Sequence, residues 1–281
     1  MVLKRVGTSV TGAVLHDIEL HEATAWAACT EAAAEAYGNP LEADVDREPG
    51  IPVPALGAVG FGLFNRVIGL GLAAPATDAQ IDAVLASYAR RDVTSIVVEV
   101  APGSEPADLP ERLASRGLVD TGYRQAKTWQ VPALYEGPGM DAVVALGPDD
   151  VDEFAQVNML AWEVPAFLAV WFGATLFADD FRHFGVKADG RLVATGAMYV
   201  SDGLAWLGFG ATLPEFQGRG MQTAILARRV HEAAVLGCRL VHSETAAHTD
   251  EAHNPSLANM LAVGFEHAYD KQWWSFPPRT T

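Results

Sequence analysis

The stretch Thr212-Leu-Pro-Glu-Phe-Gln-Gly-Arg-Gly-Met-Gln-Thr223 lies between an apolar segment and a long run of helix-forming residues. Pro214 lacks a backbone donor and therefore ends a strand. Gly218 and Gly220 permit a sharp turn and a close approach of the backbone to a ligand. A helix that begins directly after them presents unpaired N–H groups, and its dipole favours negative charge. With Arg219 as an added cation, the stretch predicts a phosphate-binding loop between a strand and a helix.

Other glycine-rich loops fit this stretch less well. A P-loop ends in Gly-Lys-Ser/Thr, which is absent here. The dinucleotide-binding fingerprint has a third glycine at the position that Thr223 occupies. The remaining alternative is a turn that serves packing alone, and Arg219 argues against it.

The segments around the loop alternate between the strand and helix patterns of an α/β or α+β fold. A β-branched or apolar run with turn residues at its ends indicates a strand, and a spacing of three to four residues indicates a helix. The second half has strands expected over 204–213, 239–246 and 265–276, and helices over 218–236 and 255–263.

The first half repeats this order of elements, which predicts two copies of one fold. It has strands expected over 67–72, 94–100 and up to Trp129, and helices over 77–90 and 109–115, the first capped by Thr77. The segment 131–140 contains two prolines and two glycines and is interpreted as a linker. The predicted organisation is a domain over 1–130, a linker over 131–140 and a domain over 141–281.

On these motifs the chain resembles the Gcn5-related N-acetyltransferase (GNAT) superfamily. The family's diphosphate loop reads Gln/Arg-x-x-Gly-x-Gly/Ala and is matched by Gln217-Gly-Arg-Gly-Met-Gln222, although Gln222 replaces a small residue. The segment Asn254-Pro-Ser-Leu-Ala-Asn-Met-Leu-Ala-Val-Gly-Phe265 is similar to the family's fourth-helix pattern. The resemblance extends over 141–276 and implies two early helices over 151–163 and 165–177. It implies a tandem arrangement of two GNAT-like domains, each a mixed, mostly antiparallel twisted sheet flanked by helices.

The resemblance also implies acetyl-CoA as the acyl donor. In the family, two central strands splay apart and the pantetheine arm enters the gap. Carried over, the backbone of Ala211, Thr212 and Leu213 would hold the pantetheine, and Asn254 would reach the same arm. The diphosphate would lie on Gln217, Gly218, Arg219, Gly220, Met221, Gln222 and Thr223.

The first half has no counterpart of this loop. After Gly71 it continues Leu-Ala-Ala-Pro-Ala-Thr-Asp78, and the carboxylate of Asp78 would repel a diphosphate. We interpret residues 1–130 as a degenerate copy that supports the other domain, and leave open a separate ligand pocket within it.

Two carboxylates are candidates for the base that accepts a proton from an amine. Glu244 lies in the predicted strand that borders the acceptor cleft, and the alternative is a strand-end carboxylate that is satisfied by backbone groups or an arginine. Glu163 falls between the two early helices, a region that shapes the acceptor pocket in the family. The family's thiolate-protonating tyrosine is replaced by Leu261, so solvent would serve as the acid.

The predicted function is transfer of an acetyl group from acetyl-CoA to a primary amine of a small molecule or peptide, by direct attack. Alternatives are an acyltransferase that uses a longer acyl-CoA and a non-catalytic CoA-binding or ligand-sensing module. The tryptophans could form an aromatic wall for a cationic acceptor, with core packing as the alternative for most of them. They are Trp162, Trp171, Trp206, Trp273 and Trp274.

Composition limits the partners. The net charge of −16 argues against nucleic acid and anionic membranes, because phosphate binding needs a basic face. Only two cysteines occur, and the first 20 residues lack the pattern of a secretory signal, so a cytoplasmic protein is expected.

The histidines and acids over 242–253 match no known ligand spacing, so no metal is expected. The final strand could pair with another subunit and give a homodimer. If the first half satisfies that strand within one chain, the protein is a monomer.

Overall fold

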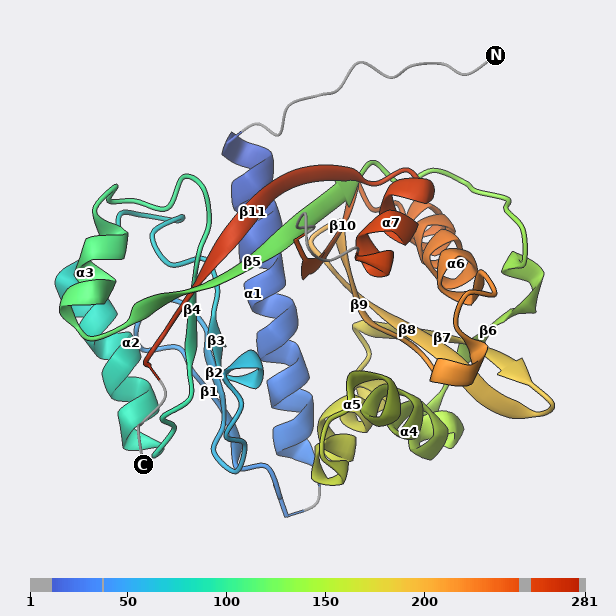
Figure 1. The fold of residues 1–281 in the computed structure, drawn as a ribbon, viewed down its shortest axis with the longest axis horizontal. Helices are drawn as coiled ribbons and strands as arrows, with labels where there is room; N and C mark the ends of the chain where they lie inside the picture. Colours follow the sequence, from blue (N-terminus) through green and yellow to red (C-terminus); the bar gives the residue numbers. More distant parts are fainter. Residues whose placement is uncertain (1–11, 37, 248–253, 278–281) are drawn as a thin grey trace.

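The computed structural model describes residues 12–36, 38–247 and 254–277, and a single nine-stranded sheet crosses the molecule (Figure 1). The helices are α1 (Gly12–Glu35), α2 (Asp78–Arg90), α3 (Leu109–Ser115), α4 (Val151–Trp162), α5 (Ala169–Ala174), α6 (Met221–Val235) and α7 (Pro255–Ala262). The strands are β1 (Ala43–Asp46), β2 (Val53–Leu56), β3 (Arg66–Val67), β4 (Val97–Val100), β5 (Val119–Gln130), β6 (Val143–Leu146), β7 (Phe181–Ala188), β8 (Arg191–Ser201), β9 (Leu204–Thr212), β10 (Leu240–Ala246) and β11 (Glu266–Ser275).

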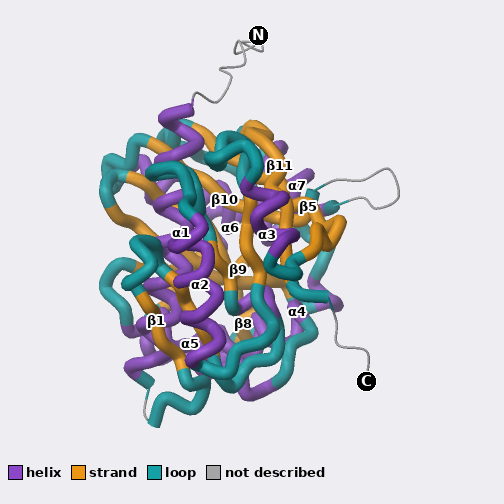
Figure 2. Tube along the Cα trace, turned by 90° about the vertical axis from the view of Figure 1, so that its left-hand side faces the viewer, coloured by secondary structure: helices purple, strands orange, loops and turns teal. Residues whose placement is uncertain are grey.

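The large sheet has the order β3-β4-β11-β5-β10-β9-β8-β7-β6. Its neighbours are antiparallel except for the parallel pairs β3–β4 and β9–β10. Strands β1 and β2 form a separate antiparallel pair. Figure 2 views the molecule from the side on which α2 and α3 lie. The predicted fold class, a mixed and mostly antiparallel sheet flanked by helices, is confirmed.

The two halves exchange their last strands. β5 ends the first half and lies between β10 and β11, whereas β11 ends the second half and lies between β5 and β4. Figure 1 shows β5 and β11 running together from one side of the molecule to the other. Both edges of β11 are therefore paired within the chain, and the first half occupies the edge at which a second subunit was one of the two alternatives.

Helix α1 was not predicted from the sequence, yet it lies along the junction between the halves. It contacts β1 and β2 on one side and α5 and β9 on the other. The indole ring of Trp26 lies 5.2 Å from that of Trp171 and 6.2 Å from that of Trp206, centroid to centroid. Its buried face also carries Glu19 and Glu22, which interrupt the apolar pattern of an amphipathic helix and conceal the helix from sequence reasoning.

The predicted strand over 67–72 is wrong in most of its length. Only Arg66 and Val67 join the sheet, because Gly69 and Gly71 turn the chain with positive φ angles. A Cβ atom at Gly71 would lie 2.3 Å from the carbonyl oxygen of Glu105, so this close approach of two loops requires glycine. The predicted cap is confirmed, since the hydroxyl of Thr77 accepts the N–H of Gln80.

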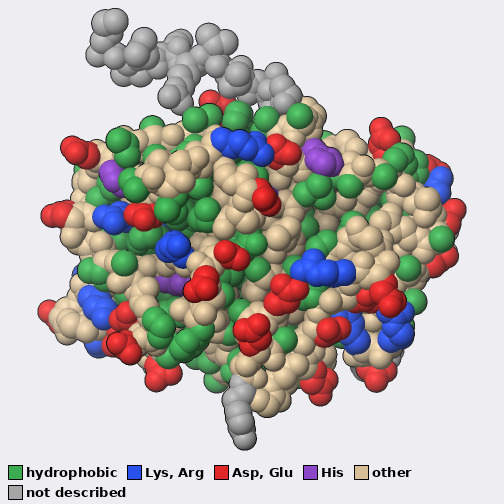
Figure 3. Space-filling model, turned by 180° about the vertical axis from the view of Figure 1, so that it is seen from behind, with side chains coloured by type: hydrophobic (Ala, Val, Ile, Leu, Met, Phe, Trp, Pro, Cys, Tyr) green, Lys and Arg blue, Asp and Glu red, His purple; other side chains and the backbone are tan. Residues whose placement is uncertain are grey.

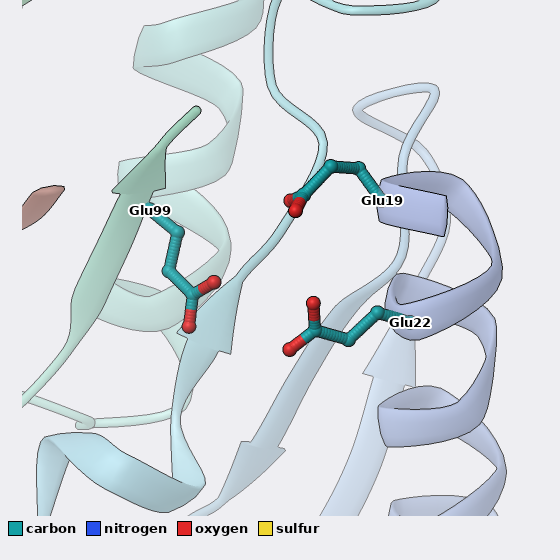
Figure 4. A group of neighbouring side chains, drawn as sticks. All are labelled: Glu19, Glu22 and Glu99. Atoms are coloured by element: carbon teal, nitrogen blue, oxygen red, sulfur yellow. The ribbon is translucent and has the colours of Figure 1, made fainter. Parts of the chain in front are cut away.

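Seven charged side chains lie buried where the two halves meet, and we call them the buried charge cluster. None of their side chains is more than 8% exposed. Figure 4 shows three of the carboxylates pointing toward one another from α1 and β4. The members are Glu19 and Glu22 on α1, Arg66 on β3, Glu99 on β4, Lys127 on β5, Glu244 on β10 and Lys271 on β11.

Lysine ammonium groups connect these carboxylates in a continuous chain. Lys271 Nζ lies 3.3 Å from Glu19 and 2.7 Å from Glu22, and it also contacts Glu99. Lys127 Nζ lies 2.5 Å from Glu22 and 3.3 Å from Glu244. Each lysine comes from an exchanged strand, so the strand exchange and the charge pairing depend on each other.

On the face shown in Figure 3, acidic side chains are interspersed with Lys and Arg side chains. No helix among the described residues is long and apolar enough to cross a membrane.

Replacing Lys271 by methionine is expected to destabilise the fold strongly, because three buried carboxylates would lose their shared cation. Breaking a buried pair costs about 3–5 kcal/mol, and the loss should shrink at lower pH as the freed carboxylates take up protons. Urea unfolding measures this free energy. Lys187→Met is the matched control, because that lysine and Asp150 form an exposed pair of the kind that contributes little to stability. Equal losses for the two variants would contradict a stabilising role of the cluster.

Candidate functional site

The loop before α6 forms an open cradle of backbone amides. Gly218 and Gly220 adopt φ angles of +72° and +77°, and a Cβ atom added at either would meet no atom within 4 Å. Gly220 is the N-cap of α6, and no side chain caps this end of the helix. The unpaired N–H groups and the helix dipole therefore face open space, which is the arrangement that binds a phosphate group. The helix begins at Met221, three residues later than expected.

Next to the cradle, β9 and β10 separate. Their parallel pairing runs only from Leu204–Leu240 to Leu207–Ser243. Beyond this point the two strands diverge, and a cavity of about 870 Å³ extends from the loop along the gap. Glu244 is the first residue of β10 past the paired segment, so it lies at the apex of the opening and lines the cavity.

A β-bulge shapes the β9 side of the opening. Two residues, Phe209 and Gly210, lie opposite Gly196 of β8, and Phe209 adopts a φ of +54°. The buried guanidinium of Arg229 on α6 supports the bulge, because Nη1 donates to the carbonyl oxygens of Gly208 at 2.9 Å and Ala197 at 2.8 Å. Burial lowers the pKa of Arg229 to about 9, so the side chain remains charged at neutral pH.

The structure brings nine of the eleven predicted CoA-contacting residues to this cavity. Leu213 is not among its lining residues, because it is buried and its N–H donates to Val193 in β8. Asn254 is also not a lining residue. Those that line the cavity are Ala211, Thr212, Gln217, Gly218, Arg219, Gly220, Met221, Gln222 and Thr223.

Asn254 has a capping role in this structure. Its Oδ1 accepts the N–H groups of Ser256 and Leu257 at the start of α7. Its Nδ2 donates to Thr245 and Ala246 of β10. The side chain thus joins α7 to β10, and it holds the neighbouring cavity residues in place rather than facing the cavity itself.

Gln222, the residue that departs from the family pattern, turns inward and does not crowd the start of the helix. Its Nε2 donates to the carbonyl oxygens of Ala211 at 2.6 Å and Thr195 at 3.0 Å. It therefore ties the first turn of α6 to the strands β8 and β9. A small residue at this position could not make these contacts.

The two candidate bases differ in their surroundings. Glu244 Oε2 accepts the indole N–H of Trp206 at 2.7 Å and lies 3.3 Å from Lys127 Nζ. Burial raises the pKa of Glu244, and the negative charge of Glu22 adds to this rise. Glu163, in contrast, is exposed at the C-terminal end of α4 with a φ of +53° and is not among the residues that line the cavity. We therefore retain Glu244 alone as a candidate base.

Sequence reasoning missed the contribution of the first half to this cavity. Trp26 on α1, Arg66 on β3 and Gln125 on β5 all line it beside Glu244. The guanidinium carbon of Arg66 lies 3.6 Å from the centroid of the Trp26 ring. No local motif marks these residues, because they reach the cavity only through the strand exchange and the unpredicted helix.

The tryptophans divide between the cavity and the core. Trp162, Trp171 and Trp206 line the cavity, and the last two are also almost completely buried. Trp273 and Trp274 lie opposite Glu99 and Val98 in the β4–β11 pairing. The proposed aromatic wall is therefore made by three of the five predicted residues together with Trp26.

Three carboxylate oxygens, from Glu19, Glu22 and Glu99, lie within 4.8 Å of one another, which is a spacing that could hold a metal ion. The ammonium group of Lys271 contacts all three carboxylates. The positive charge of Lys271 thus already offsets part of the negative charge of these carboxylates. The histidine-rich segment considered as a metal site lies partly outside the described residues, at 248–253.

Comparisons with known proteins agree with this geometry. Residues 150–265 match the family model described as "Acetyltransferase (GNAT) family". This segment is therefore similar to the GNAT acetyltransferase family, a similarity that implies acyl transfer that depends on an acyl-CoA. A search of curated proteins gave no significant match.

Solved structures share the fold at low sequence identity. A GCN5-related N-acetyltransferase from Kribbella flavida is 18% identical with a TM-score of 0.57, over 79% of this chain and 84% of that one. A tandem GNAT protein from the clavulanic acid biosynthesis pathway is 18% identical with a TM-score of 0.54, over 94% of this chain and 97% of that one. A functionally unknown conserved protein from Staphylococcus epidermidis is 11% identical with a TM-score of 0.52, over 81% and 91%. The tandem fold thus extends over nearly the whole chain.

Gly220→Glu is expected to abolish binding of acetyl-CoA, because it places a side chain and a negative charge in the amide cradle. Calorimetric titration of acetyl-CoA into the purified protein measures the loss. Gly237→Glu is the matched control, since Gly237 also has a positive φ with open space around it but lies beyond the opposite end of α6. If Gly220→Glu binds acetyl-CoA as tightly as Gly237→Glu does, the loop is not the diphosphate site.

Proposed function

We propose that this protein is an N-acetyltransferase that moves the acetyl group of acetyl-CoA to a primary amine of a small molecule or peptide. The observation that carries the proposal is the continuity of the cavity, which joins the amide cradle before α6 to the carboxylate of Glu244. One end suits a diphosphate, and the other suits a group that must lose a proton.

Acetyl-CoA would supply the activated acyl group, with its diphosphate on the amides of Gly218 to Thr223 and its pantetheine in the gap between β9 and β10. The N–H groups near Gly210 and Ala211 at the bulge would donate to the thioester oxygen as negative charge develops on it. The bulge is held rigidly because Arg229 binds the carbonyl oxygen of Gly208. A donor position that is fixed before the reaction stabilises the transition state more than a mobile one.

Glu244 would act as general base toward the attacking amine. Its raised pKa makes it a stronger proton acceptor than an exposed glutamate, and the N–H of Trp206 fixes one of its oxygens. The leaving thiolate needs little assistance near neutral pH. This is consistent with Leu261, which is half exposed on α7 where the family commonly has a tyrosine.

Glu244→Gln is expected to lower kcat by roughly 10²–10⁴-fold, because general base catalysis contributes about this factor. The KM for acetyl-CoA should change little, since Glu244 lies at the far end of the cavity from the loop. The rate of the wild type should rise with pH through a pKa above that of an ordinary glutamate, because only the ionised carboxylate accepts a proton. The assay is thiol release from acetyl-CoA with a panel of primary amines.

The exposed Glu163→Gln variant is the control and should retain full activity. If Glu244→Gln kept the wild-type rate and pH profile, Glu244 would not be the general base. Binding of acetyl-CoA without turnover of any amine would instead favour a CoA-binding sensor, and turnover only with longer thioesters would favour a different acyl donor.

A further inference from the structure

The buried charge cluster contains an unequal number of charges. Its four carboxylates, from Glu19, Glu22, Glu99 and Glu244, face three cations, from Arg66, Lys127 and Lys271. With every member ionised, one negative charge would be in excess. An uncompensated charge in a buried site costs several kcal/mol, so the cluster requires either one proton or one external cation.

Other titratable groups near the cluster do not change this count. Arg229, which stays charged on the cavity wall, donates to backbone carbonyl oxygens and has no ion pair with a cluster carboxylate among the described residues. His21 and His242 contact each other at 2.8 Å, and burial lowers the pKa of His21 to about 4 and that of His242 well below its usual range. Both rings are therefore neutral at pH 7. Burial raises the pKa values of the Cys29 thiol and the phenols of Tyr123 and Tyr269, so these groups are neutral as well.

The carboxylates that hold a proton most readily are the two ends of the chain. Burial raises the pKa of Glu19 and of Glu244. Glu22 differs, because Lys127, Lys271 and Arg66 together outweigh its burial and lower its pKa. Of the two ends, Glu244 lines the cavity, whereas Glu19 is enclosed and accepts the hydroxyl of Tyr269 at 2.9 Å.

A second feature of the same cavity indicates a ligand with hydrogen-bond donors. The side chain of Gln125 is 4% exposed and lines the cavity, and its Oε1 has no hydrogen-bond partner among the described residues. On β5 it lies two residues from Lys127, so both side chains are on the same face as Glu244 of the neighbouring strand. A carboxylate and an amide oxygen thus border one space, and both are hydrogen-bond acceptors.

We infer that this end of the cavity is a binding site for a monocationic amine, which enters as its ammonium ion and replaces the single proton of the buried charge cluster. The ammonium group donates to Glu244 and Gln125, and the cluster with its ligand carries no net charge. A neutral alcohol or an anion cannot supply the missing positive charge. This inference rests on the proposed function for its consequence in catalysis, although the binding itself does not require acyl transfer.

The buried charge cluster holds the same number of protons before and after one catalytic cycle. Binding of the ammonium ion releases the cluster proton to solvent, and the bound ammonium then gives one proton to Glu244, leaving a neutral nitrogen with a free electron pair. When this nitrogen attacks the thioester, the C–N bond forms, the C–S bond breaks, and the second proton of the nitrogen goes to the thiolate. The cluster ends with the one proton that it held at the start. Glu19 would act in this cycle as a positioning residue, because its negative charge influences whether Glu244 holds a proton.

The binding test compares n-butylammonium with n-butanol, which have similar shapes and differ in charge. Calorimetry in buffers of different ionisation enthalpy gives the number of protons released, and the Trp206 indole signal in NMR reports on Glu244. For the wild type we expect the ammonium ion to bind at least about tenfold more tightly than the alcohol and to release about one proton at neutral pH. Equal binding of the two, or no response to either, would overturn the inference.

Glu19→Gln is the decisive variant, because it removes the excess negative charge at a residue that does not line the cavity. It should lose both the proton release and most of the preference for the cation. Glu31→Gln, on the exposed part of the same helix, should behave like the wild type. A Glu19→Gln protein that still releases one proton on binding would contradict the charge count.

A measurement on the unliganded wild type keeps the inference testable if Glu19→Gln does not fold. Carbon NMR of ¹³C-labelled glutamate should show one buried carboxyl group protonated at neutral pH, and its absence would overturn the inference. Neither measurement involves acyl transfer. A positive result without turnover would therefore leave a cation-binding site and refute only the N-acetyltransferase.

Discussion

Lys127 and Lys271 each place an ammonium group among buried carboxylates that come from other strands and from α1. Each lysine belongs to a strand that one half of the chain contributes to the other half's part of the sheet. Without the exchange these carboxylates would keep only Arg66 as a cation, and without the lysines the carboxylates would bury unpaired charge. Because an unpaired buried charge is so unfavourable, this pairing requires the two halves to adopt one particular arrangement.

The charge pairing that stabilises the fold also sets the electrostatic environment of the proposed base. Glu244 is at once the end of the buried charge cluster and the first residue beyond the paired part of β9 and β10. A carboxylate at the apex of the cavity therefore takes its electrostatic environment from residues of the first half. The half without the phosphate loop contributes α1, Arg66, Gln125 and Lys127 to the site of the other.

Rigid support recurs on the opposite wall of the cavity. The bulge at Phe209 requires a positive φ at a residue with a side chain, which costs free energy and persists only when the surroundings enforce it. Arg229 enforces it from α6, and Gln222 ties the start of the same helix to β8 and β9. The amide cradle and the bulge are thus held in fixed relation by one helix, as a transfer between two bound groups requires.

The sequence alone determined the parts of this protein that depend on local chemistry. Glycines at positions 218 and 220 before a helix predict an amide cradle because backbone conformation and helix dipoles are local properties, and the residues predicted from Gln217 to Thr223 all line the cavity. Sequence patterns and the family resemblance together predicted the four helices and three of the six strands that the structure describes in the second half, and the repeated order of elements predicted the fold class. Glu244 was chosen from its strand, although its partners were unknown.

Only the tertiary structure determined which residues contact one another where the two halves of the chain meet. Helix α1 escaped prediction because its inward face carries glutamates and a histidine, which look solvent-exposed until their distant partners are known. Glu163 and Asn254 changed roles for a similar reason, since one turned out to be exposed and the other had its hydrogen-bonding groups engaged by α7 and β10. The partners of Glu19, at positions 269 and 271, lie some 250 residues away in the chain. Charge pairing over such separations leaves no local pattern, because it depends on which strands the folded sheet places side by side.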